Sequence, residues 1–288
     1  MNEIEALKAV GALNPLGTTH PHGAQAAGIS PLAGQGEMQA RFCLTVFSGG
    51  QDSTTCLHWA LANFKSVEAI FFDYGQRHVS EKQAAETIAA RLQVPLRVFR
   101  LDFFSEMGGN ALIDPSLSIQ AETETEAGSL PNTFVPGRNL IFLTYAASYA
   151  YTRGIRDLVT GVCQTDYSGY PDCRDATMRS LETALSLGLG WSLPAEPGAP
   201  DRSTGGAAEI PERKLSLHTP LMFKSKAESV RWAVELGAMD SLAFSHTCYE
   251  GAFPPCGKCP ACLLRQKGFA EAGLPDPLLL RAMATTKK

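Results

Sequence analysis

One stretch of the sequence constrains the fold more than any other, because three structural signals follow one another between residues 41 and 63. The apolar run at 42–47 is typical of a buried parallel strand, which we expect over 41–47. A turn, Ser-Gly-Gly-Gln-Asp-Ser, occupies 48–53, and the apolar spacing after it favours a helix over 53–63. Backbone N–H groups and the helix dipole converge at such a helix N-terminus, so the stretch predicts an anion site.

The residues of the turn narrow the kind of anion. Gly49 and Gly50 let the backbone approach oxygen atoms that a Cβ would block, and Ser48 and Ser53 add hydroxyl donors. The turn lacks the G-x-x-x-x-G-K-[ST] and G-x-G-x-x-G patterns, which excludes two common types of nucleotide loop. The alternative without a ligand is a small-residue turn in which Asp52 caps the helix. The strand before the turn and the helix after it favour phosphate binding.

This turn resembles the Ser-Gly-Gly-x-Asp-Ser loop of the ATP pyrophosphatases. The resemblance implies that the loop holds the β,γ-pyrophosphate of ATP while an oxygen of the substrate is adenylated. It also implies a catalytic role for Asp52. The ATP-binding residues that we predict are Phe47, Ser48, Gly49, Gly50, Gln51, Asp52, Ser53, Thr54 and, at the end of the second strand, Asp73.

Length and charge set the broad class. A chain of 288 residues, 44% of them apolar, can bury the core of one large α/β domain with an appendage. The net charge of −4 predicts no general attraction to nucleic acid. No run approaches the roughly 20 apolar residues of a membrane span, and no secretory signal opens the sequence. We therefore expect a cytoplasmic protein with no membrane or direct nucleic-acid partner.

Strand and helix patterns alternate along the chain. This order predicts an α/β fold with a doubly wound parallel sheet and right-handed crossovers. Ligands of such sheets bind beyond the carboxyl ends of the strands, where the first loop and Asp73 both fall. The predicted strands are 41–47, 67–72, 96–99, 156–160 and 216–221, and the predicted helices are 53–63, 79–92, 140–152, 174–187 and 224–236.

Other segments carry no such pattern. Residues 1–40 predict a disordered leader, with Met38 as an alternative start, and 190–214 predict a flexible insertion. The polar stretch 105–131 predicts either a mobile loop over the site or a plain surface loop. We expect an ATP pyrophosphatase domain over 41–245 and a zinc-binding region over 246–288.

Four of the eight cysteines crowd together near the C-terminus, at Cys248, Cys256, Cys259 and Cys262. Four thiolates at this spacing predict a closed structural zinc site. Iron–sulfur ligation is an alternative, but ferredoxin runs continue to a fourth cysteine followed by proline, and this run does not. Unliganded thiols are the remaining alternative. Two of the scattered cysteines, Cys43 and Cys56, are expected in the core.

Six blocks follow one another along the chain: FSGGQDSTT at 47–55, DYGQRH at 73–78, NTFVPGRN at 132–139, DYSGYPDCR at 166–174, TPL at 219–221 and CGKCPAC at 256–262. Together and in this order they resemble the 7-cyano-7-deazaguanine synthases, and the resemblance extends from about 41 to 270. It implies an adenine-nucleotide alpha-hydrolase-like, Rossmann-like fold, zinc on the four cysteines and a homodimer. It also implies conversion of 7-carboxy-7-deazaguanine, ammonia and ATP to the nitrile, a queuosine precursor, with Mg²⁺ assisting.

Two basic residues are predicted to be catalytic. Lys226, in Pro-Leu-x4-Lys-x-Glu, resembles a superfamily lysine that approaches the departing phosphates, and its alternative is a solvated helix-start lysine. Arg138 can meet the substrate carboxylate or a phosphate as a bidentate donor. Arg174 is its rival for that task.

The predicted contacts to the substrate ring come from one block. Asp166 or Asp172 can accept hydrogen bonds from the N1–H and the exocyclic amine of a guanine-like ring, or either can be a turn residue. Tyr167 and Tyr170 can stack on the ring or pack in the protein.

Three other functions compete with this one. The chain can be another ATP pyrophosphatase, such as a tRNA thiolase or a glutamine-fed amidotransferase, although no glutaminase pattern occurs and no basic RNA-binding face is indicated. It can be a relative that attaches the deazaguanine to a macromolecule. It can also be a zinc-ribbon binding module without catalysis, against which the intact Ser-Gly-Gly-x-Asp-Ser loop argues.

Overall fold

The computed structural model describes residues 38, 41–76, 79–114, 116–120, 130–165, 170–191 and 214–286. A parallel sheet lies at its centre, with strand order β3-β2-β1-β4-β5. Its strands are β1 (Phe42–Val46), β2 (Ser66–Asp73), β3 (Leu96–Arg100), β4 (Asp157–Val159) and β5 (Ser216–His218).

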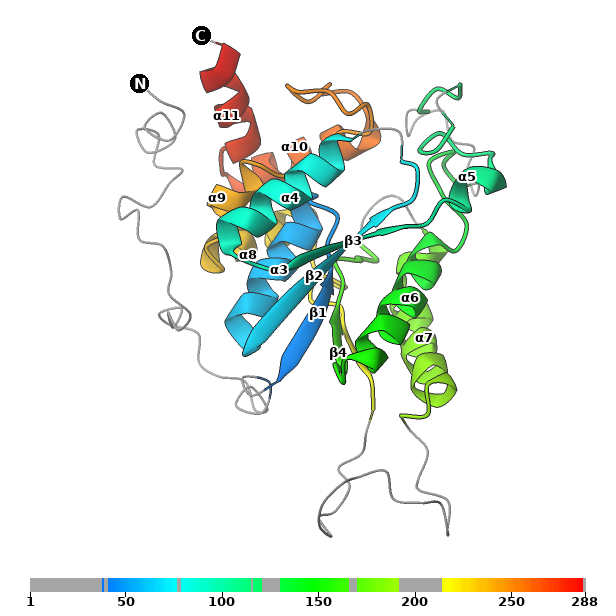
Figure 1. Cartoon of the computed structure of the whole chain (residues 1–288). Helices are drawn as coiled ribbons and strands as arrows, with labels where there is room; N and C mark the ends of the chain where they lie inside the picture. The colour runs from blue at the N-terminus through cyan, green and yellow to red at the C-terminus, as the bar shows by residue number, and fades with distance from the viewer. Residues whose placement is uncertain are drawn as a thin grey trace, which may run out of the picture.

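Helices cover both faces of this sheet (Figure 1). On one side lie α3 (Gln51–Asn63), α4 (Ser80–Leu92) and α8 (Lys226–Glu235), and on the other lie α6 (Arg138–Thr152) and α7 (Asp175–Gly188). The predicted doubly wound α/β fold is therefore confirmed. The shorter or C-terminal helices are α5 (Phe104–Met107), η2 (Pro171–Cys173), α9 (Met239–Leu242), α10 (Pro260–Ala272) and α11 (Pro277–Thr286).

The period-two alternation of the strands divides the core into two layers. Leu44, Ile70 and Leu158 are fully buried against the helices α6 and α7. Their neighbours on the opposite sheet face pack against α3 and α4, and these include Cys43 at 1% exposure. Cys56 of α3 is completely buried in the same layer. The expectation that both cysteines lie in the core is confirmed.

The sheet has its topological switch point between β1 and β4, because the chain leaves β1 toward β2 and returns to its other side as β4. Ligands of doubly wound sheets bind beyond the carboxyl ends of strands at such a point. Here the two loops touch: a Cβ on Gly161, which follows β4, would lie 2.9 Å from the Ser53 nitrogen. The glycine therefore lets the loop after β4 lie directly against the N-terminus of α3.

Two expectations need correction. The last strand ends at His218 and not at 221, because Pro220 has no N–H to donate, and the Met222 N–H closes a turn onto the Thr219 carbonyl at 3.0 Å. Part of the stretch 105–131 is packed and not a surface loop.

That packed part is the segment 110–113. Leu112 and Ile113 are buried in the core, and their N–H groups donate to Asn110 Oδ1, both at 3.2 Å. The acidic run 122–126, the leader apart from Met38, and the insertion over 192–213 lie outside the described residues.

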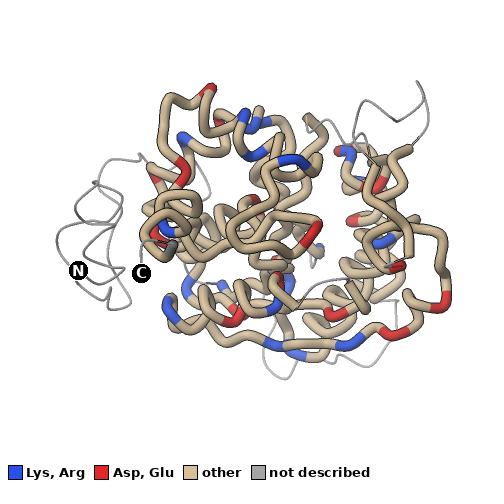
Figure 2. Tube along the Cα trace, turned by 90° about the horizontal axis from the view of Figure 1, so that it is seen from above, with Lys and Arg blue, Asp and Glu red and all other residues tan. Residues whose placement is uncertain are grey.

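The C-terminal region packs on the α/β unit. Phe269 of α10 shares a buried cluster with Val230 of α8 and Leu242 of α9. A Cβ on Gly268 would lie 2.5 Å from Lys226 Cγ, so the glycine allows α10 to approach the start of α8. Among the described residues, no helix is long and apolar enough to cross a membrane. Lysines and arginines are interspersed with acidic residues along the chain (Figure 2).

Candidate functional site

The loop between β1 and α3 is closed by its own hydroxyl groups. The Ser48 and Ser53 Oγ atoms lie 3.1 Å apart, and the Ser48 N–H donates to Ser53 Oγ at 3.3 Å. The Gly50 N–H turns back to Ser48 Oγ at 3.4 Å. The two predicted hydroxyl donors therefore lie side by side at the N-terminus of α3, where helix and loop N–H groups favour an anion. We name this loop, residues 48–53, the phosphate loop.

Gly49 is the position where the phosphate loop tolerates no side chain. Its φ of +78° is in the left-handed region, and a Cβ there would lie 2.6 Å from the Ala85 nitrogen and 2.9 Å from the Glu81 carbonyl oxygen. The phosphate loop thus lies directly on the first turns of α4.

Three residues predicted to bind ATP point their side chains into the protein. Phe47 is 1% exposed in the core, and Thr54 Oγ1 donates to the Gly50 carbonyl at 2.7 Å. Gln51 is 2% exposed, and its side-chain amide has no partner among the described residues. Contact of these three residues with a nucleotide would have to come from backbone N–H groups.

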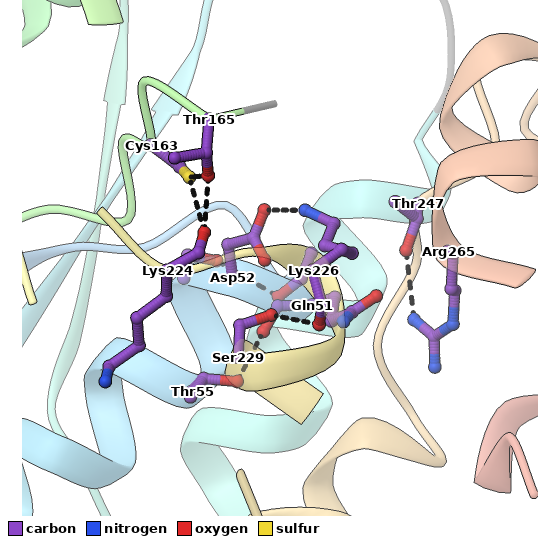
Figure 3. Close-up of polar contacts among 12 residues, drawn as sticks. Gln51, Asp52, Thr55, Cys163, Thr165, Lys224, Lys226, Ser229, Thr247 and Arg265 are labelled. Atoms are coloured by element: carbon purple, nitrogen blue, oxygen red, sulfur yellow. Dashed lines mark hydrogen bonds and ion pairs between the residues drawn. The ribbon is translucent and has the colours of Figure 1, made fainter. Parts of the chain in front are cut away.

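Lys226 and Asp52 meet at the phosphate loop. Lys226 Nζ lies 2.6 Å from Asp52 Oδ2, and the two side chains are 9% and 25% exposed (Figure 3). A capping box at the start of α8 holds the lysine, since Ser225 Oγ accepts from the Glu228 N–H and Glu228 Oε2 accepts from the Ser225 N–H. The alternative of a solvated lysine is not what the structure shows.

Asp73 lies at the carboxyl end of β2, as expected from the sequence. Its carboxylate is 3.9 Å from Lys82 Nζ of α4, and both side chains are about one third exposed. This position, at the carboxyl end of the strands, is compatible with the predicted contact of Asp73 with ATP. That contact stays a prediction.

Arg138 begins α6 and donates from Nη1 to the Tyr74 hydroxyl at 3.0 Å. Burial alone would lower the Arg138 pKa, but the surrounding tyrosines and a glutamate raise it above its usual value. The guanidinium therefore stays charged, as recognition of a carboxylate or phosphate requires. We name these residues the Arg138 cluster; its members are Tyr74, Glu81, Arg138, Tyr170 and Tyr249.

The block 166–174 is described only in part. Asp172 is 5% exposed, and its Oδ2 accepts from the Asn139 N–H at 3.0 Å, in the first turn of α6. The Tyr170 hydroxyl is 2.7 Å from Thr133 Oγ1. Arg174 is at the N-cap of α7. Asp166 and Tyr167 lie outside the described residues, and the predicted substrate contacts of the block stay predictions.

The four C-terminal cysteines converge. Their Sγ atoms all lie within 4.8 Å of one another, as a tetrahedral metal site requires. Two of the sulfurs accept backbone hydrogen bonds, from the Cys256 N–H to Cys248 Sγ and from the Cys259 N–H to Cys256 Sγ. Such N–H groups stabilise thiolates, so the donor set fits a divalent metal that prefers sulfur.

The cysteine cluster is tied to the phosphate loop through one residue. The His246 N–H donates to the Gly49 carbonyl at 2.9 Å, and its ring Nε2 lies 3.0 Å from the Cys248 carbonyl oxygen. A metal held by the cysteines would thus fix one wall of the phosphate loop.

Sequence reasoning did not single out three residues of the site. Tyr74 lies in the block at 73–78, which the sequence analysis had already singled out. A hydroxyl partner for Arg138 could have been looked for in that block. Glu81 and Tyr249 carry no local signal, because their place in the Arg138 cluster depends on how α4 and the loop between Cys248 and Cys256 approach Arg138 in three dimensions.

Comparisons with known proteins identify the family. The family described as "Queuosine biosynthesis protein QueC" matches residues 42–273. The 7-cyano-7-deazaguanine synthase of Laribacter hongkongensis is 56% identical over 238 residues, which cover 83% of this chain and 94% of that protein. Those of Chromobacterium violaceum and Bacillus subtilis are 54% and 42% identical, covering 84% and 81% of this chain and 94% and 96% of those proteins. The chain belongs to the QueC family of queuosine biosynthesis proteins.

Proposed function

We propose that the protein is a 7-cyano-7-deazaguanine synthase, an ATP-dependent ligase that forms C–N bonds. Its substrates are 7-carboxy-7-deazaguanine, ammonia and ATP. The observation that carries the proposal is the meeting of Lys226 and Asp52 on the phosphate loop, at the switch point of the sheet. The names of the similar proteins support the choice of substrate.

The chemistry explains why ATP is needed twice. A carboxylate is a poor electrophile, and transfer of AMP to one of its oxygens creates a good leaving group. Ammonia then displaces AMP and gives the amide. A second adenylation, now on the amide oxygen, allows loss of AMP and leaves the nitrile.

The phosphate loop is the part of the chain that stabilises the leaving pyrophosphate. Ser48, Ser53 and the backbone N–H groups of the loop donate to its oxygens, and the Lys226 ammonium adds a positive charge. Asp52 holds that ammonium in place at 2.6 Å before ATP binds. Mg²⁺ carried by ATP supplies further charge neutralisation. Asp73 lies at the same edge of the sheet, on the side of β2.

The Arg138 cluster receives the carboxylate end of the substrate. Arg138 offers a charged, bidentate donor whose orientation is fixed by the Tyr74 hydroxyl. The block 166–174 supplies the ring contacts in this proposal, from Asp166, Tyr167, Tyr170 and Asp172, with Arg174 as a second basic residue.

The four cysteines would hold a structural Zn²⁺ in a closed site, which supplies no step of the reaction. Its contribution is positional, through the His246 contact to Gly49. We further propose that the enzyme uses free ammonia in the cytoplasm, makes no direct contact with nucleic acid and forms a homodimer. Sedimentation velocity at several protein concentrations measures the assembly state, and a monomer throughout would exclude the dimer.

The activity is tested by mass spectrometry of the products formed from 7-carboxy-7-deazaguanine, ammonium, Mg²⁺ and ATP. The expected products are the nitrile, pyrophosphate and AMP, with the amide as an intermediate. Omission of ammonium and an Asp52→Asn variant are the controls. ATP cleavage that needs a different acceptor would reject the substrate but keep the nucleotide chemistry. No cleavage with any acceptor would favour a binding module.

A further inference from the structure

The guanidinium of Arg265, on α10, is buried and donates from all three of its nitrogens. Its side chain is 4% exposed. Nε and Nη2 form a bidentate pair with the Asp276 carboxylate, at 2.7 and 2.8 Å. Nη2 also donates to the Leu242 carbonyl at 3.1 Å. Nη1 donates to Ser245 Oγ at 2.8 Å and to Thr247 Oγ1 at 3.0 Å, the second contact being drawn in Figure 3. All five N–H groups of the guanidinium therefore have an acceptor.

The two hydroxyl acceptors of Nη1 flank His246, whose backbone lies on the phosphate loop. The His246 N–H donates to the Gly49 carbonyl at 2.9 Å. A Cβ on Gly50 would lie 3.5 Å from the His246 carbonyl oxygen, so the segment 245–247 lies along both glycines of the loop. Because Arg265 binds the residue on each side of His246, it fixes the place from which this N–H is donated.

The hydrogen bond from His246 sets the orientation of the peptide between Gly49 and Gly50. This peptide is trans. In a planar trans peptide the carbonyl and the N–H point in opposite directions. With the Gly49 carbonyl turned toward His246, the Gly50 N–H faces the other side, where Ser48 Oγ lies at 3.4 Å. That N–H is one of the backbone donors that the phosphate loop offers to an anion.

A peptide between two glycines turns over easily when nothing holds it. Rotation by half a turn would take the Gly50 φ from −78° to about +100°, which glycine adopts freely and residues with a Cβ do not. The turned-over peptide would present the Gly49 carbonyl oxygen to the phosphates and repel them. The orientation therefore has to be held from outside the peptide, and the His246 N–H does so.

We propose that Arg265 is a positioning residue for ATP, which acts through the segment 245–247 to keep the Gly50 N–H directed at the bound pyrophosphate. The proposal rests on the ATP chemistry of the function proposed above and does not depend on which oxygen is adenylated. Gly268, one turn along α10 from Arg265, lets the same helix contact Lys226, since a Cβ there would lie 2.5 Å from Lys226 Cγ. The helix α10 thus positions both a backbone donor and the ammonium of the nucleotide site.

The test measures binding of α,β-methylene-ATP with Mg²⁺ by isothermal titration calorimetry, because this analogue transfers no AMP and needs no second substrate. Arg265→Lys keeps a positive charge for Asp276, but an ammonium cannot also reach both hydroxyls of the segment 245–247. If the competent peptide orientation falls to about one tenth of the population, the Kd rises about 10-fold. The rate of pyrophosphate release at saturating ATP should stay within about threefold, because bound nucleotide selects the competent orientation.

Arg281→Lys is the matched control. This arginine contacts the segment before Cys248 as well, but its Nη1 donates to the Ala243 carbonyl, at 3.3 Å, outside residues 245–247. Its Kd should stay within about twofold of wild type. Circular dichroism and elemental analysis check that every variant is folded and keeps the metal of the cysteine cluster.

A second variant tests the route through the hydroxyl groups without changing the arginine. Ser245→Ala combined with Thr247→Val removes both acceptors of Nη1 and leaves the pair of Arg265 with Asp276 in place. It should raise the Kd as Arg265→Lys does. A protein that carries all three changes should be no weaker than Arg265→Lys alone, because the changes interrupt the same route.

Gly50→Ala separates a held peptide from a general loss of stability. The alanine Cβ would lie 3.4 Å from Ser48 Oγ, an ordinary contact, but alanine excludes the turned-over peptide. In the Gly50→Ala protein, Arg265→Lys should therefore raise the Kd by less than about threefold, whatever the alanine itself costs. If the alanine prevents binding altogether, the additivity measured with the Ser245 and Thr247 changes decides.

Three results would overturn the proposal. One is a Kd for Arg265→Lys equal to that for Arg281→Lys. Another is an equally large loss in the Gly50 and Gly50→Ala proteins, which would make Arg265 a stabilising residue only. The third is full additivity of Arg265→Lys with the changes in the segment 245–247. A protein that binds the analogue but makes no nitrile rejects the proposed substrate, and the Kd values still decide the role of Arg265. A wild-type protein that does not bind the analogue rejects both.

Discussion

The ammonium of Lys226 lies 2.6 Å from Asp52 Oδ2, although 174 positions separate the two residues in the sequence. One residue begins α8 and the other lies in the first turn of α3, so the ion pair joins two helix N-termini at the phosphate loop. With the lysine 9% exposed and its carboxylate partner 25% exposed, the pair is neither fully buried nor freely solvated. Phosphate oxygens could therefore reach the ammonium without breaking apart the core.

Replacement of Lys226 by Met tests this pair. Loss of a charge that stabilises leaving pyrophosphate should lower the rate of adenylation by about 10²–10³-fold. The unfolding free energy should change by only about 1 kcal/mol, because Asp52 keeps access to water. The measurements are pyrophosphate release and urea unfolding.

Lys224→Met is the matched control, since this lysine lies two residues earlier and its ammonium is over the Trp232 ring, 4.7 Å from the centroid. Its rate should stay near wild type. Adenylation by Lys226→Met within threefold of this control would remove Lys226 from the mechanism.

Loss of the metal site should weaken the binding of ATP at the phosphate loop. Cys256→Ser removes one of four converging sulfurs, so bound zinc measured by elemental analysis should fall to near zero. We expect the melting temperature to drop by about 5–10 °C, which corresponds to roughly 3 kcal/mol at this chain length. Affinity for ATP should also fall, because His246 connects Cys248 to Gly49. Cys163→Ser, which changes a cysteine outside the cluster, is the control and should retain all of the bound metal. Iron instead of zinc in the wild-type protein would support the iron–sulfur alternative.

Much of this architecture could be predicted from the sequence. The strand, turn and helix around residues 41–63 identified the phosphate loop, because all three signals are local. The helix α10 could also have been predicted from local signals, since Pro260 lies at its first position and Gly273 ends it at a φ of +70°. The capping box of Ser225 and Glu228 is likewise a local pattern.

The Arg138 cluster could not be predicted in this way. Its members come from segments that meet only after the sheet is assembled, so neither periodicity nor motif spacing records their contacts. The sequence placed Glu81 in the first turn of a helix, where an acidic residue is ordinary. Only the packing of α4 against the phosphate loop and Gly251 reveals its surroundings.

The pH dependence of the unfolding free energy should show when Glu81 loses its proton. Burial raises its folded-state pKa to about 7, above the ordinary value of 4.5, so the folded protein holds this proton more tightly than the unfolded chain. The resulting stability is complete below pH 4.5 and is lost as the pH rises through 7. The difference between the two pKa values corresponds to about 3 kcal/mol.

The Glu81→Gln variant has no carboxyl group to ionise at this position, so it does not lose stability in this way as the pH rises. Its unfolding free energy relative to wild type should therefore increase between about pH 5 and pH 8, by up to about 3 kcal/mol. Tyr74 and Tyr249, whose pKa values are raised by burial, stay neutral over this range. A difference that does not vary with pH would show that Glu81 ionises normally in the folded protein.

Asp172 is predicted either to accept hydrogen bonds from the substrate ring or to be a turn residue, and two substitutions separate these roles. Its nearly buried carboxylate accepts from the Asn139 N–H, next to Arg138, so it fixes the start of α6. Asp172→Ala removes the acceptor and should lower the unfolding free energy by about 1–2 kcal/mol, as loss of a helix cap does. Asp172→Asn keeps an acceptor oxygen and should retain both stability and the KM for 7-carboxy-7-deazaguanine within about threefold.

A different result would place Asp172 on the substrate. A carboxylate that accepts from both ring donors cannot be replaced by an amide without leaving one donor facing an N–H group. In that case Asp172→Asn would raise the KM for the deazaguanine by about 10-fold or more, while stability and the KM for ATP stay unchanged. Asp175→Asn is the control, because this residue pairs with the exposed Arg179 on α7 and should affect neither constant.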